Sequence, residues 1–356
     1  MNAGKDPDIL IEKRNRCGLV TLNRPQALNA LTYDMIEALE RRYVEWAADP
    51  DIYAVVMRSA GGRAFCGGGD IKALYEWNRR GDMETILRLY GIEYQHNWSL
   101  DRFIKPHVAL IDGIVMGGGV GISIYGTHRV AGPGYSFAMP ETAIGFFPDV
   151  GATWFLSRLT GQTGMYLALT GRQVGAADAF RLGLVTHCIA PDHHDAIIEG
   201  LSEAEPVDPL LDGFHADPGR GDLETVQPLI DRIFSGASVE AILAALDAEK
   251  GDHAGWASSV AADIRTKSPT GLKVAFRQMR MGPSIGLDEA LRIEYRLARR
   301  FLQGSEFYEG VRAALIDRDR KPAWNPAKLE DVSDADIDAL FAPLPDGEFA
   351  LANPYS

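Results

Sequence analysis

Two carboxylic side chains stand in a strongly apolar part of the sequence, the segment MPETAIGFFPD at residues 139–149. They are Glu141 and Asp149, eight positions apart. Burial in such surroundings raises the pKa of a carboxyl group toward neutrality, which suits the group to general acid or base catalysis. The alternative interpretation is that the two carboxylates cap the ends of adjacent helices. The segment alone leaves both interpretations open.

Two glycine-rich turns precede these carboxylates, AFCGGGDI at residues 64–71 and MGGGVG at residues 116–121. Each follows a predicted strand and leads into a predicted helix. The amides at such a turn point outward without an intrahelical partner. Two turns together would aim two N–H groups at one oxygen atom, which is an oxyanion hole worth about 3–4 kcal/mol per donor. One turn alone is better explained as a tight strand-to-helix connection.

Strands and helices alternate around the glycine turns. Short apolar strands are predicted at residues 53–57 and 108–111. The order of strand, strand, glycine turn and helix occurs twice, at residues 52–75 and 107–126. This alternation predicts an α/β core with mainly parallel strand pairing.

The strand pattern stops after about residue 190. Turn residues between Pro206 and Gly219 predict an irregular linker, and the pattern from Leu223 onward is helical. The chain is therefore predicted to have two parts. Residues 1–200 form the α/β core with the site, and residues 201–356 form a helical C-terminal region.

The composition excludes several classes of protein. The 356 residues carry a net charge of −13 and are 46% hydrophobic, which is typical of a globular chain and not of a disordered one. The acidic balance argues against a nucleic acid or an anionic membrane as a partner. Three scattered cysteines argue against a disulfide framework or a metal site and favour a reducing, cytoplasmic location. The charged N-terminus lacks the apolar core of a signal peptide, and no apolar run approaches the roughly 20 residues of a membrane span.

The motifs in this order resemble the crotonase (enoyl-CoA hydratase/isomerase) superfamily. The resemblance lies in NRP at residues 23–25, ALNAL at 27–31, AFCGGGDIK at 64–72 and DGIVMGGGVGIS at 112–123. The segment MPETAIGFFPDVGATWFLSRL is similar to a branch of that superfamily that hydrolyses 3-hydroxyacyl-CoA thioesters. The C-terminal strings SPTGLKVAFRQM, EYRLARR and FYEGVRAALIDRDRKPAWNP extend this similarity over nearly the whole chain.

The resemblance implies a spiral of ββα units followed by the helical region, and a coenzyme A thioester as the substrate. It implies no metal and no cofactor, because coenzyme A is part of the substrate. By match to the motifs, the N–H groups of Gly69 and Gly118 would hold the thioester oxygen. Glu141 would be the main catalytic carboxylate, and Asp149 would bind the substrate hydroxyl or orient the attacking water.

Further residues are assigned to substrate binding by the same resemblance. Glu93 falls where the hydrolases contact the substrate, although an exposed charge on a polar helix is an equally good interpretation of this residue. The backbone near the first glycine turn would meet the adenine and pantetheine arms of coenzyme A. The residues concerned are Ala27, Leu28, Ala64, Gly68, Asp70 and Ile71.

Gly121 separates the expected activities. In the hydratases of this superfamily this position carries a second glutamate, and water addition to a double bond needs two groups that handle protons. Glycine supplies neither, so thioester hydrolysis is favoured. The resemblance implies 3-hydroxyisobutyryl-CoA as the substrate, with 3-hydroxypropionyl-CoA as another. Glu141 would act as a base or as a nucleophile. An enoyl-CoA isomerase, a hydratase and a non-catalytic acyl-CoA-binding protein are the alternatives, and a homo-oligomer is possible.

Four other signals are given less weight. Ser284 matches the G-x-S-x-G pattern but follows a predicted helix rather than a strand, so we expect a turn. His193 and His194 are expected to be solvated rather than to bind metal. Cys66 is interpreted as a small packed residue. The basic cluster of Arg296, Arg299 and Arg300 is predicted to be a solvated helix face, with coenzyme A phosphates or a partner subunit as alternative contacts.

Overall fold

The computed structural model describes residues 7–355. The start of the charged N-terminal stretch, used above to argue against a signal peptide, lies outside the described residues. Among the described residues, no helix combines the length and the apolar character needed to cross a bilayer.

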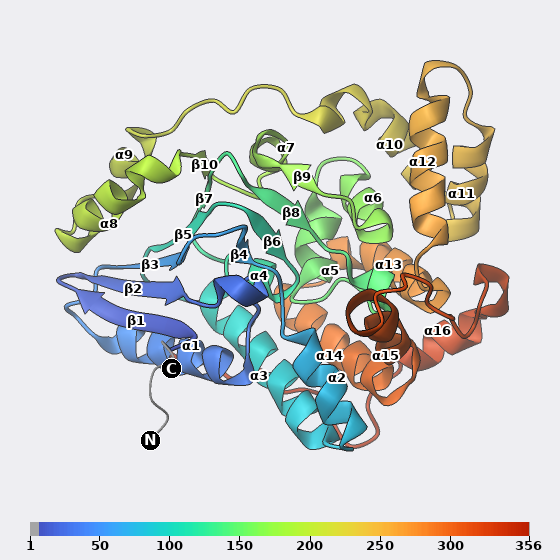
Figure 1. The fold of residues 1–356 in the computed structure, drawn as a ribbon, viewed down its shortest axis with the longest axis horizontal. Helices are drawn as coiled ribbons and strands as arrows, with labels where there is room; N and C mark the ends of the chain where they lie inside the picture. The colour runs from blue at the N-terminus through green and yellow to red at the C-terminus, as the bar shows by residue number, and fades with distance from the viewer. Residues whose placement is uncertain (1–6, 356) are drawn as a thin grey trace.

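Two sheets form the centre of the molecule (Figure 1). The larger sheet has the strand order β1-β2-β3-β5-β7-β10, in which only the β1–β2 pair is antiparallel. Its strands are β1 (Ile9–Arg14), β2 (Cys17–Leu22), β3 (Ala54–Ser59), β5 (His107–Ile111), β7 (His128–Ala131) and β10 (His187–Cys188). The smaller sheet has the order β4-β6-β8-β9, made of β4 (Ala64–Cys66), β6 (Ile114–Met116), β8 (Ser136–Ala138) and β9 (Val174–Gly175).

The predicted ββα repeat is present. In each unit the first strand joins the larger sheet and the second strand joins the smaller one, as in β3–β4 followed by α2 (Ile71–Arg79). The next unit is β5–β6 followed by the short helix α4 (Gly118–Gly121). The third pair, β7–β8, leads into the 3-10 turn η2 (Glu141–Ile144). Because successive units advance in the same direction, both glycine turns and the turn at Glu141 come to the same end of the smaller sheet.

Helices cover both sheets. Those of the first part are α1 (Tyr33–Ala48), α3 (Met83–Asp101), α5 (Ala152–Phe155), α6 (Thr163–Thr170), α7 (Ala176–Arg181) and α8 (His194–Ser202). Those that follow are α9 (Val207–Asp212), α10 (Gln227–Phe234), α11 (Val239–Ala248), α12 (Ala254–Arg265), α13 (Pro269–Met281), α14 (Leu287–Gln303), α15 (Glu306–Val311) and α16 (Asp334–Phe341). No strand follows β10 within the described residues, as predicted. The predicted irregular linker is wrong in one respect, because α9 interrupts it.

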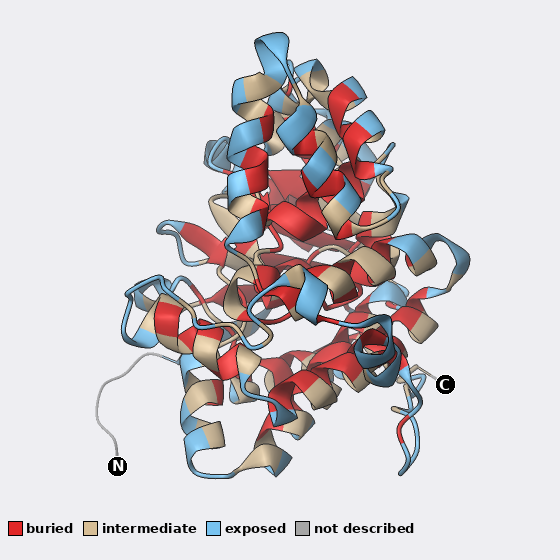
Figure 2. Ribbon diagram, turned by 90° about the vertical axis from the view of Figure 1, so that its right-hand side faces the viewer, coloured by how far each residue is buried: buried red, intermediate tan, exposed pale blue. Residues whose placement is uncertain are grey.

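The helical region shares its core with the sheets. One cluster of buried apolar side chains runs from Val20 in β2 to Phe341 in α16. Figure 2 shows the same continuity, with buried residues on the inner faces of the helices as well as in the sheets. The chain passes from α9 to α10 along an extended connection and then packs α13 and α14 back against the first part (Figure 1). The boundary near residue 200 therefore marks a change of secondary structure and not a break in the core.

Helix α15 approaches the turn η2 backbone to backbone. A methyl group placed on Gly310 of α15 would lie 2.3 Å from the carbonyl carbon of Ile144 and 2.4 Å from its oxygen. Such distances are far below van der Waals contact, so the packing requires glycine at this position. A contact this close fixes the distance between the C-terminal region and the turn that begins with Glu141.

We expect Gly310→Ala to lower the free energy of unfolding by about 1–3 kcal/mol, because the added methyl group overpacks a backbone contact. Thermal melting followed by circular dichroism measures the effect. Gly255→Ala is the matched control, since Gly255 lies in α12 with no atom within 4 Å of the added methyl group and alanine favours the helix. Equal melting temperatures for the two variants would contradict the prediction.

Candidate active site

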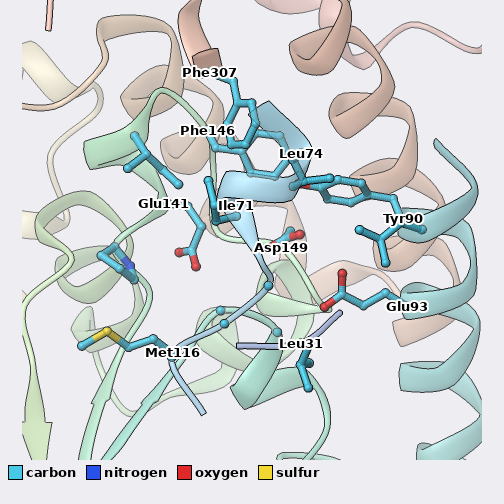
Figure 3. A pocket seen from close by; sticks show the side chains of 18 of the residues that line it. Leu31, Ile71, Leu74, Tyr90, Glu93, Met116, Glu141, Phe146, Asp149 and Phe307 are labelled. Carbon is cyan, nitrogen blue, oxygen red and sulfur yellow. The ribbon is translucent and has the colours of Figure 1, made fainter. Parts of the chain in front are cut away.

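A cavity opens between the two glycine turns, η2 and the helices α2, α3 and α15 (Figure 3). Three carboxylic residues line it, namely Glu93, Glu141 and Asp149. The rest of the lining is mostly apolar and includes Leu31, Ile36, Ile71, Leu74, Leu89, Tyr90, Ile144, Phe146 and Phe307. Phe307 comes from α15, so the helical region closes a side of the cavity that the first part leaves open. A few polar groups in an apolar pocket are typical of a small-molecule site.

The two glycine turns face each other at the floor of this cavity. A methyl group on Gly118 would lie 3.5 Å from the backbone nitrogen of Gly69. Among residues 7–355 neither the Gly69 N–H nor the Gly118 N–H donates a hydrogen bond. Two residues with free amides, from separate turns, thus line one cavity, while their joint contact with one oxygen atom stays a prediction.

The segment that carries the NRP and ALNAL motifs positions the first glycine turn. The Asn29 side-chain amide donates to the Ala64 carbonyl at 2.9 Å. The Gly67 N–H donates to the Leu28 carbonyl at 2.8 Å, and the Leu31 N–H donates to the Gly68 carbonyl at 2.9 Å. None of these bonds uses the N–H of Gly69, a residue that lines the cavity. Residues 28–31 therefore hold the first glycine turn in place through backbone hydrogen bonds and the buried side-chain amide of Asn29.

Asp70 has a structural role in this arrangement. Its carboxylate accepts from the Ala73 N–H at 3.2 Å and so caps helix α2. The other oxygen accepts from the Arg24 guanidinium at 3.0 Å. Both oxygens are engaged within the chain, so these contacts explain Asp70 without a substrate.

The structure brings together most of the predicted site residues. Seven of them line the cavity, namely Gly68, Gly69, Ile71, Glu93, Gly118, Glu141 and Asp149. Four do not line it, namely Ala27, Leu28, Ala64 and Asp70. Leu28 is 36% exposed and lies against Gly67 outside the cavity. The assignment of this outer region to the coenzyme A arms stays a prediction.

Glu141 is the first residue of η2 and points into the cavity (Figure 3). The residue is buried, and its Oε2 atom has no hydrogen-bond partner among the described residues. Burial raises the pKa of Glu141 well above its ordinary value, and the nearby Asp149 and Glu294 raise it further. The interpretation of Glu141 as a helix cap is wrong, because η2 has no side-chain capping hydrogen bond and the buried Oε2 of Glu141 is unpartnered.

Asp149 is held by a tyrosine that sequence analysis missed. The Tyr94 hydroxyl, on α3, donates to Asp149 Oδ2 at 2.8 Å. Burial raises the pKa of Asp149, and the bond from Tyr94 opposes that rise. Nothing in the sequence around Tyr94 signals this contact apart from its position next to Glu93.

Glu93 is buried, so its interpretation as an exposed charge on a polar helix is wrong, while its contact with the substrate stays a prediction. Its side chain reaches the second glycine turn, where a methyl group on Gly118 would lie 2.4 Å from Glu93 Oε1. Burial, with a smaller contribution from the charge of Asp149, raises the pKa of Glu93 from 4.5 to about 8. Glu93 is thus mainly protonated at neutral pH and can donate a hydrogen bond.

Gly121 has no room for a side chain. A methyl group there would lie 2.7 Å from the Asn97 side-chain nitrogen and 2.9 Å from Val150 Cβ. Asn97 therefore fills the space next to the backbone at this position. A glutamate side chain at residue 121 would therefore clash with Asn97 and Val150 unless these residues moved.

The signals given less weight are explained by contacts within the chain. Ser284 lies in a 3-10 turn and donates to the Met281 carbonyl at 2.8 Å. Cys66 is fully buried, burial raises the pKa of its thiol to about 12, and it packs as predicted. His193 stacks on Phe214, with ring centroids 4.7 Å apart.

The prediction of a solvated helix face for the basic cluster is wrong. Arg299 pairs with Asp346 at 2.6 Å, and Arg296 pairs with Glu348 at 2.9 Å. Arg300 donates to the Leu340 carbonyl at 2.8 Å. The three arginines hold the C-terminal segment of the chain against α14, and the signal for this role lies in acidic residues about fifty positions away in the sequence.

Comparison with known proteins agrees with the geometry. The profile of the enoyl-CoA hydratase/isomerase family matches residues 17–341. A Xenopus tropicalis protein named 3-hydroxyisobutyryl-CoA hydrolase, mitochondrial, is 41% identical over 98% of this chain and 92% of its own length. A Rattus norvegicus protein of the same name is 42% identical over 95% of this chain and 89% of its own.

Two solved structures share the whole architecture. One, described as a carnitinyl-CoA dehydratase from Mycobacterium thermoresistibile, has a TM-score of 0.90 and 36% identity over 98% of this chain and 99% of its own. The other, described as an enoyl-CoA hydratase from Rhodobacter sphaeroides, has a TM-score of 0.90 and 37% identity over 97% of this chain and 100% of its own. The spiral of ββα units with a helical C-terminal region is thereby confirmed as the fold.

We expect Glu93→Gln to stabilise the protein in a pH-dependent way. Because the folded state raises the pKa of Glu93 from 4.5 to about 8, folding binds a proton in this window and the wild type loses stability as the pH rises through it. The glutamine variant does not titrate, so its melting temperature should match the wild type near pH 4.5 and exceed it by about 2–6 °C at pH 8.

The matched control for this measurement is Glu84→Gln, an exposed glutamate on the same helix. Its melting temperature should follow the wild type across the whole pH range. A difference between Glu93→Gln and the wild type that stays constant from pH 4.5 to pH 8 would refute the buried, protonated state of Glu93.

Proposed function

The chain belongs to the enoyl-CoA hydratase/isomerase family, and from this premise we propose that it hydrolyses a 3-hydroxyacyl-CoA thioester. The substrate is 3-hydroxyisobutyryl-CoA, and the products are 3-hydroxyisobutyrate and free coenzyme A. The observation that carries the proposal is the pairing of two free amides with the buried, unpartnered carboxyl oxygen of Glu141 in one cavity. The names of relatives at about 40% identity over nearly the full chain support the same reaction.

The two amides would polarise the thioester. With its carbonyl oxygen between the N–H groups of Gly69 and Gly118, the carbonyl carbon becomes open to attack. Negative charge then develops on that oxygen, and preorganised amides in a cavity with little water stabilise it more than water would. Both amides belong to turns held by backbone hydrogen bonds, so they need no reorganisation during the reaction.

Glu141 would manage the proton. In its ionised form it takes a proton from a water molecule, and the water oxygen attacks the carbonyl carbon. The carbon–sulfur bond breaks, coenzyme A leaves as a thiolate, and the proton passes to the sulfur. Direct attack by Glu141 is the alternative route, which forms a mixed anhydride that water then cleaves.

Asp149 and Glu93 would bind the 3-hydroxyacyl group. Asp149 keeps an oxygen beyond the one that Tyr94 engages, and this oxygen can accept from the substrate hydroxyl. Glu93, protonated at neutral pH because of its raised pKa, can donate to the substrate. Two polar groups of opposite hydrogen-bonding character in an otherwise apolar lining would select a hydroxylated acyl chain over a plain one.

Hydration of an enoyl-CoA is the second candidate, since the descriptions of the two solved structures name a dehydratase and a hydratase. The packing around Gly121 weighs against it, because it leaves no place for a second carboxylate at that position. Isomerisation needs only one carboxylate and remains a further candidate. A protein that binds acyl-CoA without turnover is the remaining alternative.

The wider setting is proposed on the same basis. The reaction needs water and no separate cofactor, and coenzyme A enters as part of the substrate. A reducing compartment such as the cytoplasm suits three cysteines that are all free and buried, whereas the names of the relatives place those proteins in mitochondria. Assembly into a homo-oligomer stays a prediction.

We expect purified protein to release free thiol from 3-hydroxyisobutyryl-CoA. Glu141→Gln should lower the rate at least about 100-fold, since it removes the base or nucleophile. Asp149→Asn should lower it about 10-fold or more, mainly through substrate orientation. The wild-type rate should rise with pH as Glu141 ionises. A chromogenic thiol reagent measures all three, with the exposed Asp51→Asn as a control of unchanged rate.

Other outcomes would replace the proposal. Absorbance changes with enoyl-CoA substrates and no thiol release would establish the hydratase or isomerase. Binding of acyl-CoA without either reaction, unchanged in Glu141→Gln, would establish the binding protein. Trapping of an acyl group on Glu141 by hydroxylamine would separate the nucleophilic route from the general-base route.

A further inference from the structure

The turn that directly follows Asp149 has an unfavourable backbone conformation. Val150 has φ of 52° and Gly151 has φ of 85°, so two successive residues lie in the left-handed region. Glycine accepts such a conformation, but a β-branched valine is an outlier there. Residues in sparsely populated conformations persist only when their surroundings hold them, and they gather at functional sites.

Three polar side chains, those of Tyr125, Gln278 and Glu294, hold this turn. Tyr125 donates its hydroxyl hydrogen to the Val150 carbonyl at 2.6 Å. Gln278 of α13 donates to the Pro148 carbonyl at 3.0 Å and to the Thr153 hydroxyl oxygen at 2.8 Å. Two of the three groups, Gln278 and Glu294, come from the helical region, more than a hundred residues from the turn.

Glu294 of α14 makes two of these contacts, one with each of its oxygens. Its Oε2 accepts from the Gly151 N–H at 2.6 Å, and its Oε1 accepts from the Thr153 N–H at 2.9 Å. The residue is 0% exposed, and no cation pairs with it among residues 7–355. A buried carboxyl group without a cationic partner is costly to ionise, and burial raises the pKa of Glu294 from 4.5 to about 8. Placing this residue at the turn therefore lowers the stability of the fold.

The contacts of Glu294 reach the site through Asp149. Asp149 immediately precedes the turn, and its side chain accepts the hydrogen bond from the Tyr94 hydroxyl. Helix α14 also packs on α3, where the rings of Tyr295 and Tyr94 meet edge to face at 6.4 Å. Glu294 and Tyr295 are adjacent in α14. Glu294 binds the turn that follows Asp149, and Tyr295 packs on Tyr94, which donates to the Asp149 carboxylate.

We propose that Glu294 is a positioning residue of the active site, which clamps the left-handed turn at Val150 and thereby aims Asp149 at the substrate hydroxyl. The proposal rests on the proposed function. In this proposal the helical region not only covers the core but also sets the position of a carboxylate in the active site. Glu294 itself does not line the cavity, so it acts through the backbone of residues 149–153.

Glu294→Gln tests the proposal without changing the volume of the side chain. The amide keeps one acceptor but presents an NH₂ group to the second backbone N–H, so one clamp bond is lost. We expect kcat for thiol release to fall about 10- to 100-fold while KM changes less than about threefold. Glu289→Gln, on the same helix but at the surface, is the matched control with unchanged kcat.

A second substitution separates positioning from general stability. Val150→Gly adopts the left-handed conformation without strain, so the turn depends less on its clamp. In the Glu294→Gln background, Val150→Gly should restore kcat at least threefold, although it removes a buried side chain and lowers the melting temperature. A merely structural role of Glu294 predicts the opposite, a further loss in the double variant.

Hydrogen exchange supplies a readout that does not depend on turnover. The amides of Gly151 and Thr153 should exchange at least about 10-fold faster in Glu294→Gln than in the wild type, measured by mass spectrometry on peptides that cover residues 146–156. If the wild type fails to hydrolyse the thioester, the proposed function fails while the exchange result still judges the clamp. Full kcat in Glu294→Gln, or unchanged protection of the two amides, would overturn the proposal.

Discussion

Several carboxyl groups are buried in one apolar region, and the surrounding structure has to supply the hydrogen bonds that stabilise them. Glu93, Glu141 and Asp149 share a cavity, and Glu294 lies just behind it. Charges of one sign in a medium of low polarity repel each other and lose hydration, so the pKa of each group rises. The fold tolerates this cost because backbone amides and one tyrosine hydroxyl replace part of the lost water. The same cost provides a carboxyl group able to exchange protons near neutral pH.

The close approach of the two glycine turns is the second requirement. The ββα repeat delivers them to the same end of the smaller sheet, and the segment before α1 fixes the first turn through backbone bonds and the buried Asn29 amide. Side chains would prevent the approach, since Glu93 Oε1 already occupies the space beside Gly118. The residues Gly69 and Gly118, with their free amides, and the acidic residue Glu93 thereby line one cavity, which neither turn would form alone.

The helical region completes the site rather than standing apart from it. Phe307 closes the cavity, Gly310 lets α15 lie against the turn of Glu141, and Glu294 with Gln278 holds the turn after Asp149. The arginines of α14 bind the last segment of the chain and so keep this helix in place.

The sequence by itself determined the repeat of strands and glycine turns and the helical character of the C-terminal region. These follow from local patterns, because hydrophobic period and glycine content act over a few residues. The family resemblance added seven of the residues that line the cavity. Only the tertiary structure decided that Glu93 is buried, that Tyr94 and Glu294 hold Asp149 and its turn, and that the arginine cluster is paired within the chain. The physical reason is that burial and pairing of a polar side chain depend on which distant segment packs against it. For Glu294 and Gly151 that segment is 143 residues away, and no local pattern records it.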